Sequence, residues 1–530
     1  MNKSYQKRIG CARECLLPQQ VRERIEGALR QQTSLRSSLL RRIVFHVEKW
    51  YHDNGFYGAR VVRHGPLESN DQLIFEVNEG DITKLDFKFQ DKLGNICKGN
   101  TNIGVIKRAL PREIAVGKAY NIRALDKAYE SIYSLNLFSN VNIIPQFDHR
   151  NGAMSAEIVL QERPQKWRTD VRTCLKMVPG LAFLPTLTSL QQSGTTIYFE
   201  RQNIKGLNRS FQGAITLSNL FYPEDFNFEY THPYMDGLDD PRNRTLRASC
   251  FNTRQHSPVF RCGPRANDKP ICVDRKGFKA TITENYTEKS KFTYGVVMED
   301  IRTRDEDGSI AARGHRVSFN GPQVRNNSPD STTLSGTGID RMATFQANLT
   351  RDNTISVNGT IVGARDVIQV DQGVGIDTKP AFFNRLQMSA TRFIPLRNVQ
   401  EGEGNAAPPL LVLHGAIGNC VGDVPYHEAF TIGGPNSARG YNVGETAASR
   451  RKLEVAAEIR VPVKNTNTNL CGFVEHRNDL GGSIGSPENR TRGHGSSAGV
   501  GIQLGLLRAE YVLDDSSGKG SVLFHLGERF

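Results

Sequence analysis

The sequence contains no long hydrophobic run. Its most apolar windows, residues 180–187 (GLAFLPTL) and 408–418 (PPLLVLHGAIG), are far shorter than the roughly 18–20 residues that a membrane-spanning helix needs. A helical membrane protein is therefore excluded. A membrane-spanning barrel is not excluded, because its strands need only about ten residues of alternating character. Such strands leave the mean hydropathy low, and it is −0.45 here.

Paired cysteines and clustered histidines are also lacking. The nine cysteines are an odd number spread singly along the chain, and Cys11 and Cys15 have no second pair at zinc-ligand spacing. The twelve histidines form no HExxH-like pattern. The sequence therefore predicts neither a disulfide framework nor a metal site, and we expect no cofactor.

Basic residues outnumber acidic ones, but they do not gather in one place. The chain has 68 Lys and Arg against 55 Asp and Glu, a formal net charge of +13. This excess fits either a solvated basic surface or an acidic partner, such as nucleic acid or anionic lipid. Basic clusters interleaved with aromatic residues, which are typical of nucleic-acid binding, do not occur. We therefore expect no nucleic-acid partner.

The first 163 residues alternate between helical and strand patterns. Residues 39–56 carry apolar side chains at spacings of three and four, which predicts an amphipathic helix that Gly55 ends. Two alternating runs follow, and the order of helix and hairpin recurs about 80 residues later, which indicates a repeated α+β module. We predict a partial module at 33–80 and a complete one at 81–163. Segment 1–32 is expected to be poorly ordered or the remnant of a truncated module, and it resembles no targeting peptide.

After Pro164 the helical pattern disappears. Residues 164–530 consist of short alternating runs, such as 195–203 (TTIYFERQN) and 225–234 (DFNFEYTHPY), enough for about fourteen to eighteen strands. Soluble sandwiches alternate too. A closed barrel in lipid, however, must pair its last strand with its first, and a strand ending on the terminal Phe530 suits such a seam. The alternative is that Phe530 merely ends a strand.

One short motif is typical of hydrolases. Residues 495–499 (GSSAG) match GxSxG, in which Ser497 would be the nucleophile, but that chemistry requires a strand–turn–helix and another alternating run follows here. His414 and His427 flank Asp423 without forming an acid–base pattern. We therefore expect no enzyme.

A glycine-rich stretch, residues 430–445 (FTIGGPNSARGYNVGE), carries a single arginine, Arg439. A phosphate cradle would need a helix start after it, and none is indicated. An ordinary turn remains open. A third reading is a loop that docks its guanidinium on a buried carboxylate or aromatic ring. The following hairpin offers Phe473, Glu475 and Asp479 for that role.

Several long segments are similar to those of one known family. Residues 81–95 (DITKLDFKFQDKLGN), 206–213 (GLNRSFQG) and 420–445 (CVGDVPYHEAFTIGGPNSARGYNVGE) resemble the POTRA-plus-barrel superfamily of BamA and the two-partner secretion transporters. The closer resemblance is to its chloroplast protein-import channels. It implies a transmembrane β-barrel of about sixteen antiparallel strands in the plastid outer membrane, with POTRA modules in the intermembrane space. It also implies unfolded precursor proteins with transit peptides, GTP-binding translocon receptors and the envelope lipid bilayer as partners.

The resemblance also implies which residues form the site. In this family an arginine on a loop folded into the lumen is held by an F-x-D-x-G motif. The corresponding positions here are Gly433, Gly434, Arg439, Gly440 and Tyr441 in the loop, Phe473, Glu475 and Asp479 on the docking strand, and Phe530 at the seam. Arg477 replaces the motif glycine and adds a positive charge beside the carboxylate, which implies a less firmly held loop.

The predicted function is a protein-conducting channel of the plastid outer envelope. The family usually carries three POTRA modules, whereas one complete module is predicted here. Two alternatives therefore stay open: an insertase for outer-membrane barrel proteins, and a non-conducting shortened paralogue that binds translocon partners. A soluble hydrolase using Ser497 is a third.

Overall fold

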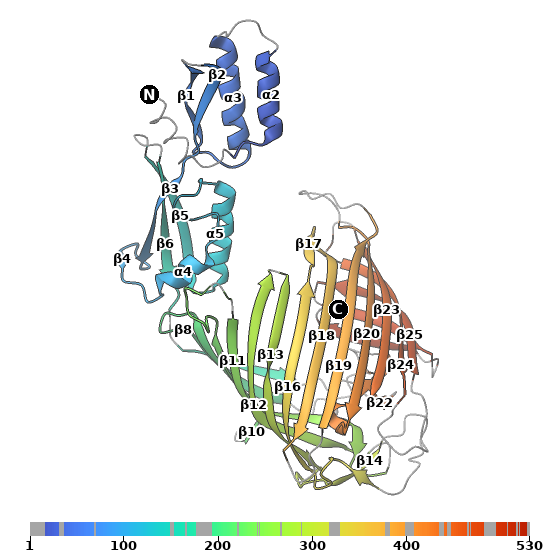
Figure 1. The fold of residues 1–530 in the computed structure, drawn as a ribbon. Helices are drawn as coiled ribbons and strands as arrows, with labels where there is room; N and C mark the ends of the chain where they lie inside the picture. Colours follow the sequence, from blue (N-terminus) through green and yellow to red (C-terminus); the bar gives the residue numbers. More distant parts are fainter. Residues whose placement is uncertain are drawn as a thin grey trace. The chain divides into compact units, whose positions relative to one another are not determined.

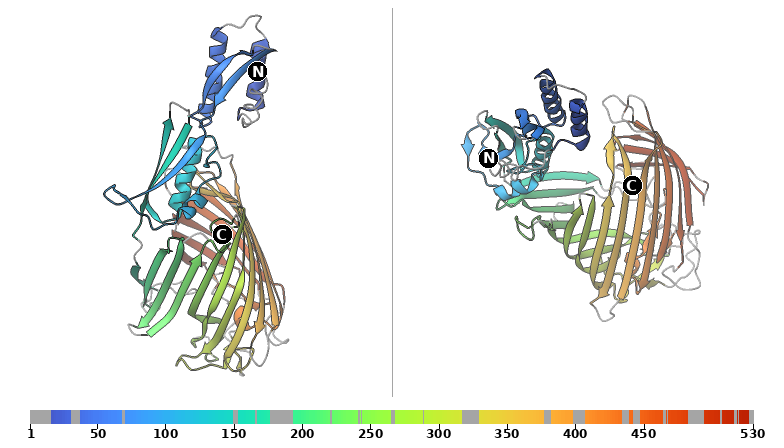
Figure 2. Two further views of the ribbon diagram at one scale, coloured as in Figure 1. Left: turned by 60° about the vertical axis from the view of Figure 1, so that its left-hand side comes forward. Right: turned by 45° about the horizontal axis from the view of Figure 1, so that its top comes forward.

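The computed structural model divides into two units: 1–166 with 202–208, and 167–201 with 209–530. Figures 1 and 2 show them as ribbons coloured along the chain. The structure describes residues 16–30, 37–67, 70–148, 153–164, 167–175, 193–219, 222–240, 242, 244–264, 268–287, 289–316, 329–376, 382–397, 407–433, 439–441, 447–463, 466, 468–481, 494–505, 507–515, 518 and 520–526.

The first unit begins with a two-helix module. Helices α2 (Gln19–Arg30) and α3 (Ser37–Asp53) precede a hairpin of β1 (Arg60–Leu67) and β2 (Asn70–Asn78). Apolar residues at helical spacing line the buried face of α3, and Gly55, at φ +91°, follows its end as predicted. Part of the segment predicted to be poorly ordered is helix α2, because Leu17, Val21 and Ile25 pack against α3.

The second module of this unit is a sheet with two helices. Strand β3 (Ile82–Gln90) runs parallel to β6 (Ala153–Glu162), in the order β4-β3-β6-β5, with β4 at Ile96–Cys97 and β5 at Phe138–Asp148. Helices α4 (Ile103–Ala109) and α5 (Ile122–Ser134) lie between β4 and β5 in the chain, and α5 buries Leu125, Ala128 and Ile132. The asparagines Asn102 and Asn121 cap the two helices by accepting backbone N–H groups. Strand β5 lies at an edge of this sheet.

The second unit is a closed antiparallel barrel (Figures 1 and 2). Within the described residues, sixteen long strands form its wall, which confirms the predicted fold class. They are β7 (Arg168–Leu175), β8 (Ser193–Ile204), β9 (Arg209–Asn219), β10 (Tyr222–His232), β11 (Arg244–Arg261), β12 (Pro270–Thr287), β13 (Ser290–Arg304), β16 (Ile339–Asp352), β18 (Thr360–Gly375), β19 (Phe382–Pro395), β20 (Leu410–Gly422), β23 (Arg451–Pro462), β24 (Thr468–Asp479), β25 (His494–Leu504), β26 (Leu507–Asp514) and β27 (Gly520–Leu526).

The barrel closes through the neighbours β27 and β7. Shorter strands, β14 (Arg313–Arg316), β15 (Asp330–Ser331) and β17 (Ile355–Val357), extend the wall at its ends. Phe530, the predicted seam residue, lies outside the described residues, so its prediction stays untested.

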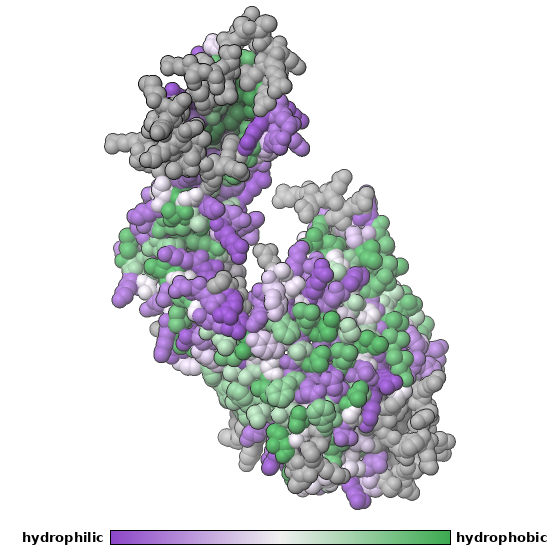
Figure 3. Space-filling view, viewed as in Figure 1, coloured by the Kyte–Doolittle hydropathy of each residue, from purple (hydrophilic) through white to green (hydrophobic). Residues whose placement is uncertain are grey.

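The barrel strands alternate between an apolar outer face and a largely charged inner face. On β23 and β24, Val455, Ile459, Leu470 and Val474 are 44–58% exposed, whereas the intervening side chains are mostly buried. Figure 3 shows hydrophobic side chains spread over the visible face of the barrel. Because successive side chains of a strand point to opposite faces, the buried positions point into the barrel. Many of them are Glu, Arg or Lys, which water or ion pairs must satisfy.

Among the helices that the structure describes, none has both the length and the apolar character needed to cross a membrane.

Candidate functional site

The site is formed by the connection between β20 and β23, residues 423–450, which we call the lumen segment. It begins with the short helix η2 (Tyr426–Glu428) and strand β21 (Phe430–Ile432), and β21 pairs with β22 (Ala447–Ser449) near its end. Between these strands the structure describes Gly433 and 439–441. The segment therefore folds back on itself and places a few side chains against the inner wall of the barrel.

Arg439 is fully buried against that wall. Its backbone N–H donates to Glu475 Oε1 at 2.6 Å, and its Nε lies 3.4 Å from Glu475 Oε2. Its guanidinium carbon lies 3.3 Å from the ring centroid of Phe473, a stacked cation–π geometry. The Arg439 side chain is 0% exposed. The two residues that the family motif indicated therefore do contact Arg439 in the structure.

Two further carboxylates complete the environment of Arg439. Its Nη2 lies 3.2 Å from Glu458 Oε2, and its Nη1 donates to Glu510. Glu458 also accepts from Arg460 Nε at 2.7 Å and from Arg508 Nη2 at 2.5 Å. One arginine from the lumen segment thus joins a buried network of wall charges. Removing one member of such a network typically costs about 3–5 kcal/mol, because it leaves an opposite charge buried without compensation.

The register of four strands explains how these groups meet. Glu458 on β23 pairs with Phe473 on β24, Phe473 with Gly499 on β25, and Gly499 with Val512 on β26. A Cβ on Gly499 would lie 2.6 Å from the Phe473 ring, so only glycine lets this ring lie flat across β25. Arg439 then stacks on the Phe473 ring.

Ser497, the serine of the hydrolase-like motif, belongs to the same inner face. Its hydroxyl donates to Glu475 Oε1 at 2.9 Å, and it is almost fully buried. It lies on strand β25, and no helix follows it there. Ser497 therefore orients the carboxylate that holds Arg439.

Gly440 and Tyr441 fix the chain immediately after Arg439. Gly440 has φ +88°, and a Cβ there would approach Val512 Cγ1 to 3.3 Å. Tyr441 is buried, and its hydroxyl donates to the backbone oxygen of Ser496 at 3.2 Å. Both residues thus hold residues 439–441, which we call the tip of the lumen segment, against β25 and β26.

Other predicted positions lie farther from Arg439. Asp479 accepts from Ser449 Oγ and from the backbone N–H of Gly481, so it anchors the end of the lumen segment. Gly433 has φ +113° just after β21, and Gly434 lies outside the described residues.

Arg477 does not leave an uncompensated charge beside Glu475. Its Nη1 lies 3.4 Å from Glu454 Oε1, closer than the 3.9 Å between its Nη2 and Glu475 Oε2. Glu454 lies opposite Arg477 in the β23–β24 register. Glu454 therefore compensates the positive charge that Arg477 adds in place of the motif glycine.

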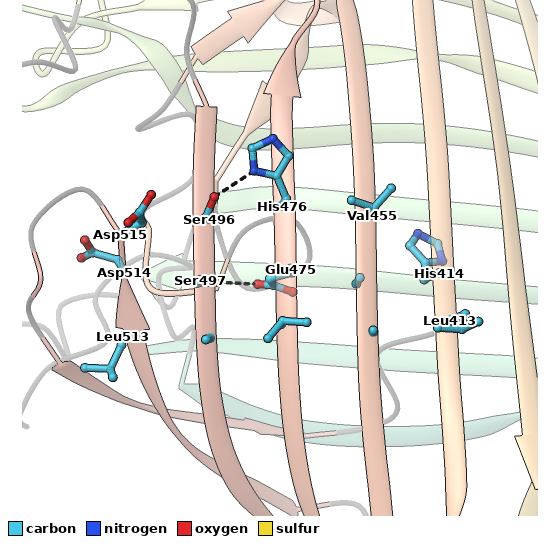
Figure 4. Close-up of a pocket in the computed structure, with 14 residues that line it drawn as sticks. Leu413, His414, Val455, Glu475, His476, Ser496, Ser497, Leu513, Asp514 and Asp515 are labelled. Carbon is cyan, nitrogen blue, oxygen red and sulfur yellow. Dashed lines mark hydrogen bonds between the residues drawn. The ribbon is translucent and has the colours of Figure 1, made fainter. Parts of the chain in front are cut away.

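A shallow depression of about 830 Å³ lies along this wall, over β20 and β23 to β26. Figure 4 shows the Glu475–Ser497 pair beside a second pair, His476 and Ser496, whose Nδ1 and Oγ are 2.8 Å apart. His476 has the same parity along β24 as the exposed Val474, so it points away from the inner face. Among the described residues, no cluster of His, Cys, Asp or Glu suitable for a metal ion occurs.

Sequence reasoning missed Glu458 and Glu510, although a signal for Glu458 exists. Four of the five charged residues of β23 fall on one face of the strand, and Arg451, at its start, is on the other; the four are Lys452, Glu454, Glu458 and Arg460. A period of two with charges facing inward indicates a polar lumen. Which strands bring such charges to Arg439 depends on long-range register.

Comparisons with known proteins identify the family of each part of the chain. The Toc75-like second POTRA domain matches residues 1–81, a Toc75-like POTRA domain matches 82–162, and the Omp85 superfamily domain matches 203–530. The chain is 51% identical over its whole length to Protein TOC75-3, chloroplastic, of Arabidopsis thaliana and to Protein TOC75, chloroplastic, of Pisum sativum. It spans 65% and 66% of their lengths, just under two thirds.

A solved structure shares the fold. BamA from Haemophilus ducreyi lacking POTRA domains 1–3 superposes with a TM-score of 0.57 at 13% identity, covering 96% of this chain and 97% of that one. The chloroplast relatives and the barrel confirm the predicted plastid outer-membrane localisation. The chain belongs to the Omp85 superfamily and carries Toc75-like POTRA domains before its barrel.

Proposed function

We propose that this protein is a protein-conducting channel of the plastid outer envelope. Unfolded precursor proteins pass through the barrel lumen, and GTP-binding receptors of the translocon present them. The POTRA modules lie in the intermembrane space, where the edge strand β5 can add an extended client segment by backbone hydrogen bonding, without reading its sequence. In this proposal the protein is not an enzyme and carries no cofactor.

The observation that carries the proposal is the docked lumen segment. A connection that places a fully buried arginine among wall carboxylates occupies the inside of the barrel. A charged inner face passes a hydrated chain once this connection moves, because displaced ion pairs are replaced by water. The segment in turn keeps the barrel narrow when no client is present.

The experiment is conductance of the full chain reconstituted in planar bilayers, combined with crosslinking to an arrested precursor in isolated plastids. We expect a wide pore that prefers cations or is weakly selective, with larger or more frequent openings in Arg439→Ala. Substitution of the exposed Arg242, whose pair with Asp240 lies outside the barrel strands, is the matched control. A closed barrel that fails to crosslink would instead favour a partner-binding paralogue.

An insertase for barrel proteins predicts a different outcome in the same plastids. Depletion would then reduce the envelope content of barrel proteins and leave import of stromal precursors intact. Our proposal predicts loss of stromal import first. This comparison distinguishes the two roles without reference to the fold, which they share.

A further inference from the structure

The beginning of the lumen segment contacts the wall at a second place. Glu428, in η2, accepts from Arg385 Nη1 at 2.7 Å and from Arg275 Nη2. Its side chain is only 14% exposed. Arg275 is on β12 and Arg385 is on β19, strands separated in the wall by β13, β16 and β18. A single carboxylate from the segment therefore bridges two distant strands of the wall.

The residues around Glu428 pack firmly against the same sector. Phe430 lies in an apolar cluster with Val424 and the β20 residue Cys420. A Cβ on Gly418 would lie 2.6 Å from the Phe430 ring, so the ring covers β20 at this glycine. Arg385 and Lys452 lie 5.4 and 5.1 Å from the ring centroid. Residues 424–432 thus form an arm with its own apolar and ionic contacts, which we call the η2 arm.

Glu428 and Arg439 hold different strands of the wall. Arg439 bonds to β23, β24 and β26 through Glu458, Glu475 and Glu510, whereas Glu428 bonds to β12 and β19. Lys452, over the Phe430 ring, reaches Glu475 through Glu454 and Arg477. Because the two groups of ion pairs have different wall partners, we expect them to contribute largely independently to stability.

We propose that Glu428 is a second anchor of the lumen segment, which ties the η2 arm to Arg275 and Arg385 and releases it separately from Arg439. Opening then has two steps: the η2 arm leaves the wall at one step, and Arg439 leaves it at the other. The consequence for gating rests on the proposed channel function, whereas the existence of two anchors does not. Glu428 is a positioning residue, since it acts through the segment it holds.

Two native cysteines can report the two anchors. Cys420 is buried in the cluster under Phe430, next to Arg385 across the β19–β20 pairing. Cys471 is buried in the row that runs from Arg460 on β23 to Glu510 on β26. Both are free thiols. A buried thiol reacts with a water-soluble maleimide only when its cover opens locally, so its labelling rate measures that opening.

The test compares the labelling rates of both thiols in the full chain, folded in detergent and analysed by peptide mass spectrometry. In Glu428→Gln, we expect Cys420 to react at least about tenfold faster, because Arg275 and Arg385 lose their shared carboxylate. Cys471 should stay within about twofold of the unsubstituted protein. Arg439→Gln should give the reverse pattern. Glu428→Asp, which keeps the charge, should fall between Glu428→Gln and the unsubstituted protein.

The control is Glu306→Gln, which removes an exposed carboxylate paired with Lys269 and should change neither rate. If Glu428→Gln does not show the heat-sensitive gel mobility of a folded barrel, Arg385→Gln replaces it, and the labelling rates of Cys420 and Cys471 are compared in the same way. Equal acceleration of both thiols, or no acceleration of Cys420, would overturn the second anchor. If the two thiols react as expected but the reconstituted barrel conducts no ions, the channel function is refuted and the second anchor is still supported.

Discussion

The two anchors of the lumen segment, Arg439 at its tip and Glu428 in the η2 arm, are held by opposite arrangements of charge. At the tip, one arginine with no exposed surface lies among three carboxylates of the wall. At the η2 arm, one carboxylate that is 14% exposed lies between two arginines. Because the cost of an uncompensated charge grows with burial, the tip should be the stronger anchor. We therefore expect the η2 arm to detach from the wall before the tip does.

Loss of the tip arginine should have the largest effect. In Arg439→Met, Glu458, Glu475 and Glu510 lose a shared cation, and docking of the segment should weaken by about 3–5 kcal/mol. The expected result in single-channel recordings is a shift towards the widest conductance level. Arg242→Met serves as the control, and indistinguishable recordings from the two variants would contradict the role of Arg439.

Loss of one tip carboxylate should have a smaller effect. Glu458→Gln leaves Glu475 and Glu510 on Arg439 but removes the acceptor that Arg460 and Arg508 share. We expect the folded barrel to lose about 2–3 kcal/mol, read from the urea midpoint of its folded gel band. If the midpoint did not move, the wall arginines would have to be satisfied without Glu458.

Acid should release the arm before the tip. Burial lowers the pKa of His427 to about 4, and both of its ring nitrogens are buried without a hydrogen-bond partner among the described residues. Burial raises the pKa of Glu428, but Arg275, His427 and Arg385 outweigh it, and the net pKa is below its ordinary 4.5. Glu299 and Asp371 face the same two arginines.

The sign of the effect follows from proton binding. Between pH 6.5 and 4 the released His427 binds a proton that the docked one does not, so docking weakens as pH falls. Below 4.5 Glu428 acts in the same direction. The labelling rate of Cys420, corrected for intrinsic thiol reactivity, should rise from pH 7 to pH 5 while that of Cys471 does not. A parallel rise of both rates would point to general loosening of the barrel.

The smallest expected effect concerns the backbone beside Arg439. Gly440→Ala should cost about 1–2 kcal/mol, since alanine at positive φ is strained and its Cβ approaches Val512. Gly359→Ala is the matched control, because Gly359 has φ +78° with no neighbour within 4 Å of its Cβ position. The difference between the two unfolding midpoints measures the cost of the contact between the new Cβ and Val512. Equal midpoints would mean that the Val512 side chain moves aside without cost.

The sequence predicted the barrel and part of the tip anchor for local reasons. Alternation within each strand is a local property, and the family motif brought Arg439, Phe473 and Glu475 together. Glu510 could not be assigned, because placing it beside Arg439 requires the register of three successive strand pairs. Glu428 carries no sequence signal either: it lies in a single short helical turn between strands, and its partners are 153 and 43 residues away.

The hydrolase-like GSSAG stretch shows how a catalytic signature can arise by coincidence. Gly495, Ser497 and Gly499 all fall on the inner face of β25, because alternate residues of a strand share one face. The Ser497 hydroxyl donates a hydrogen bond to Glu475, and Gly499 leaves room for the Phe473 ring. The two unspecified positions of the signature are simply those that point to the outer face. Any strand whose packing requires glycine, serine and glycine at three successive inward positions will match the same GxSxG pattern. Pattern searches will therefore repeatedly report false nucleophiles in barrel walls.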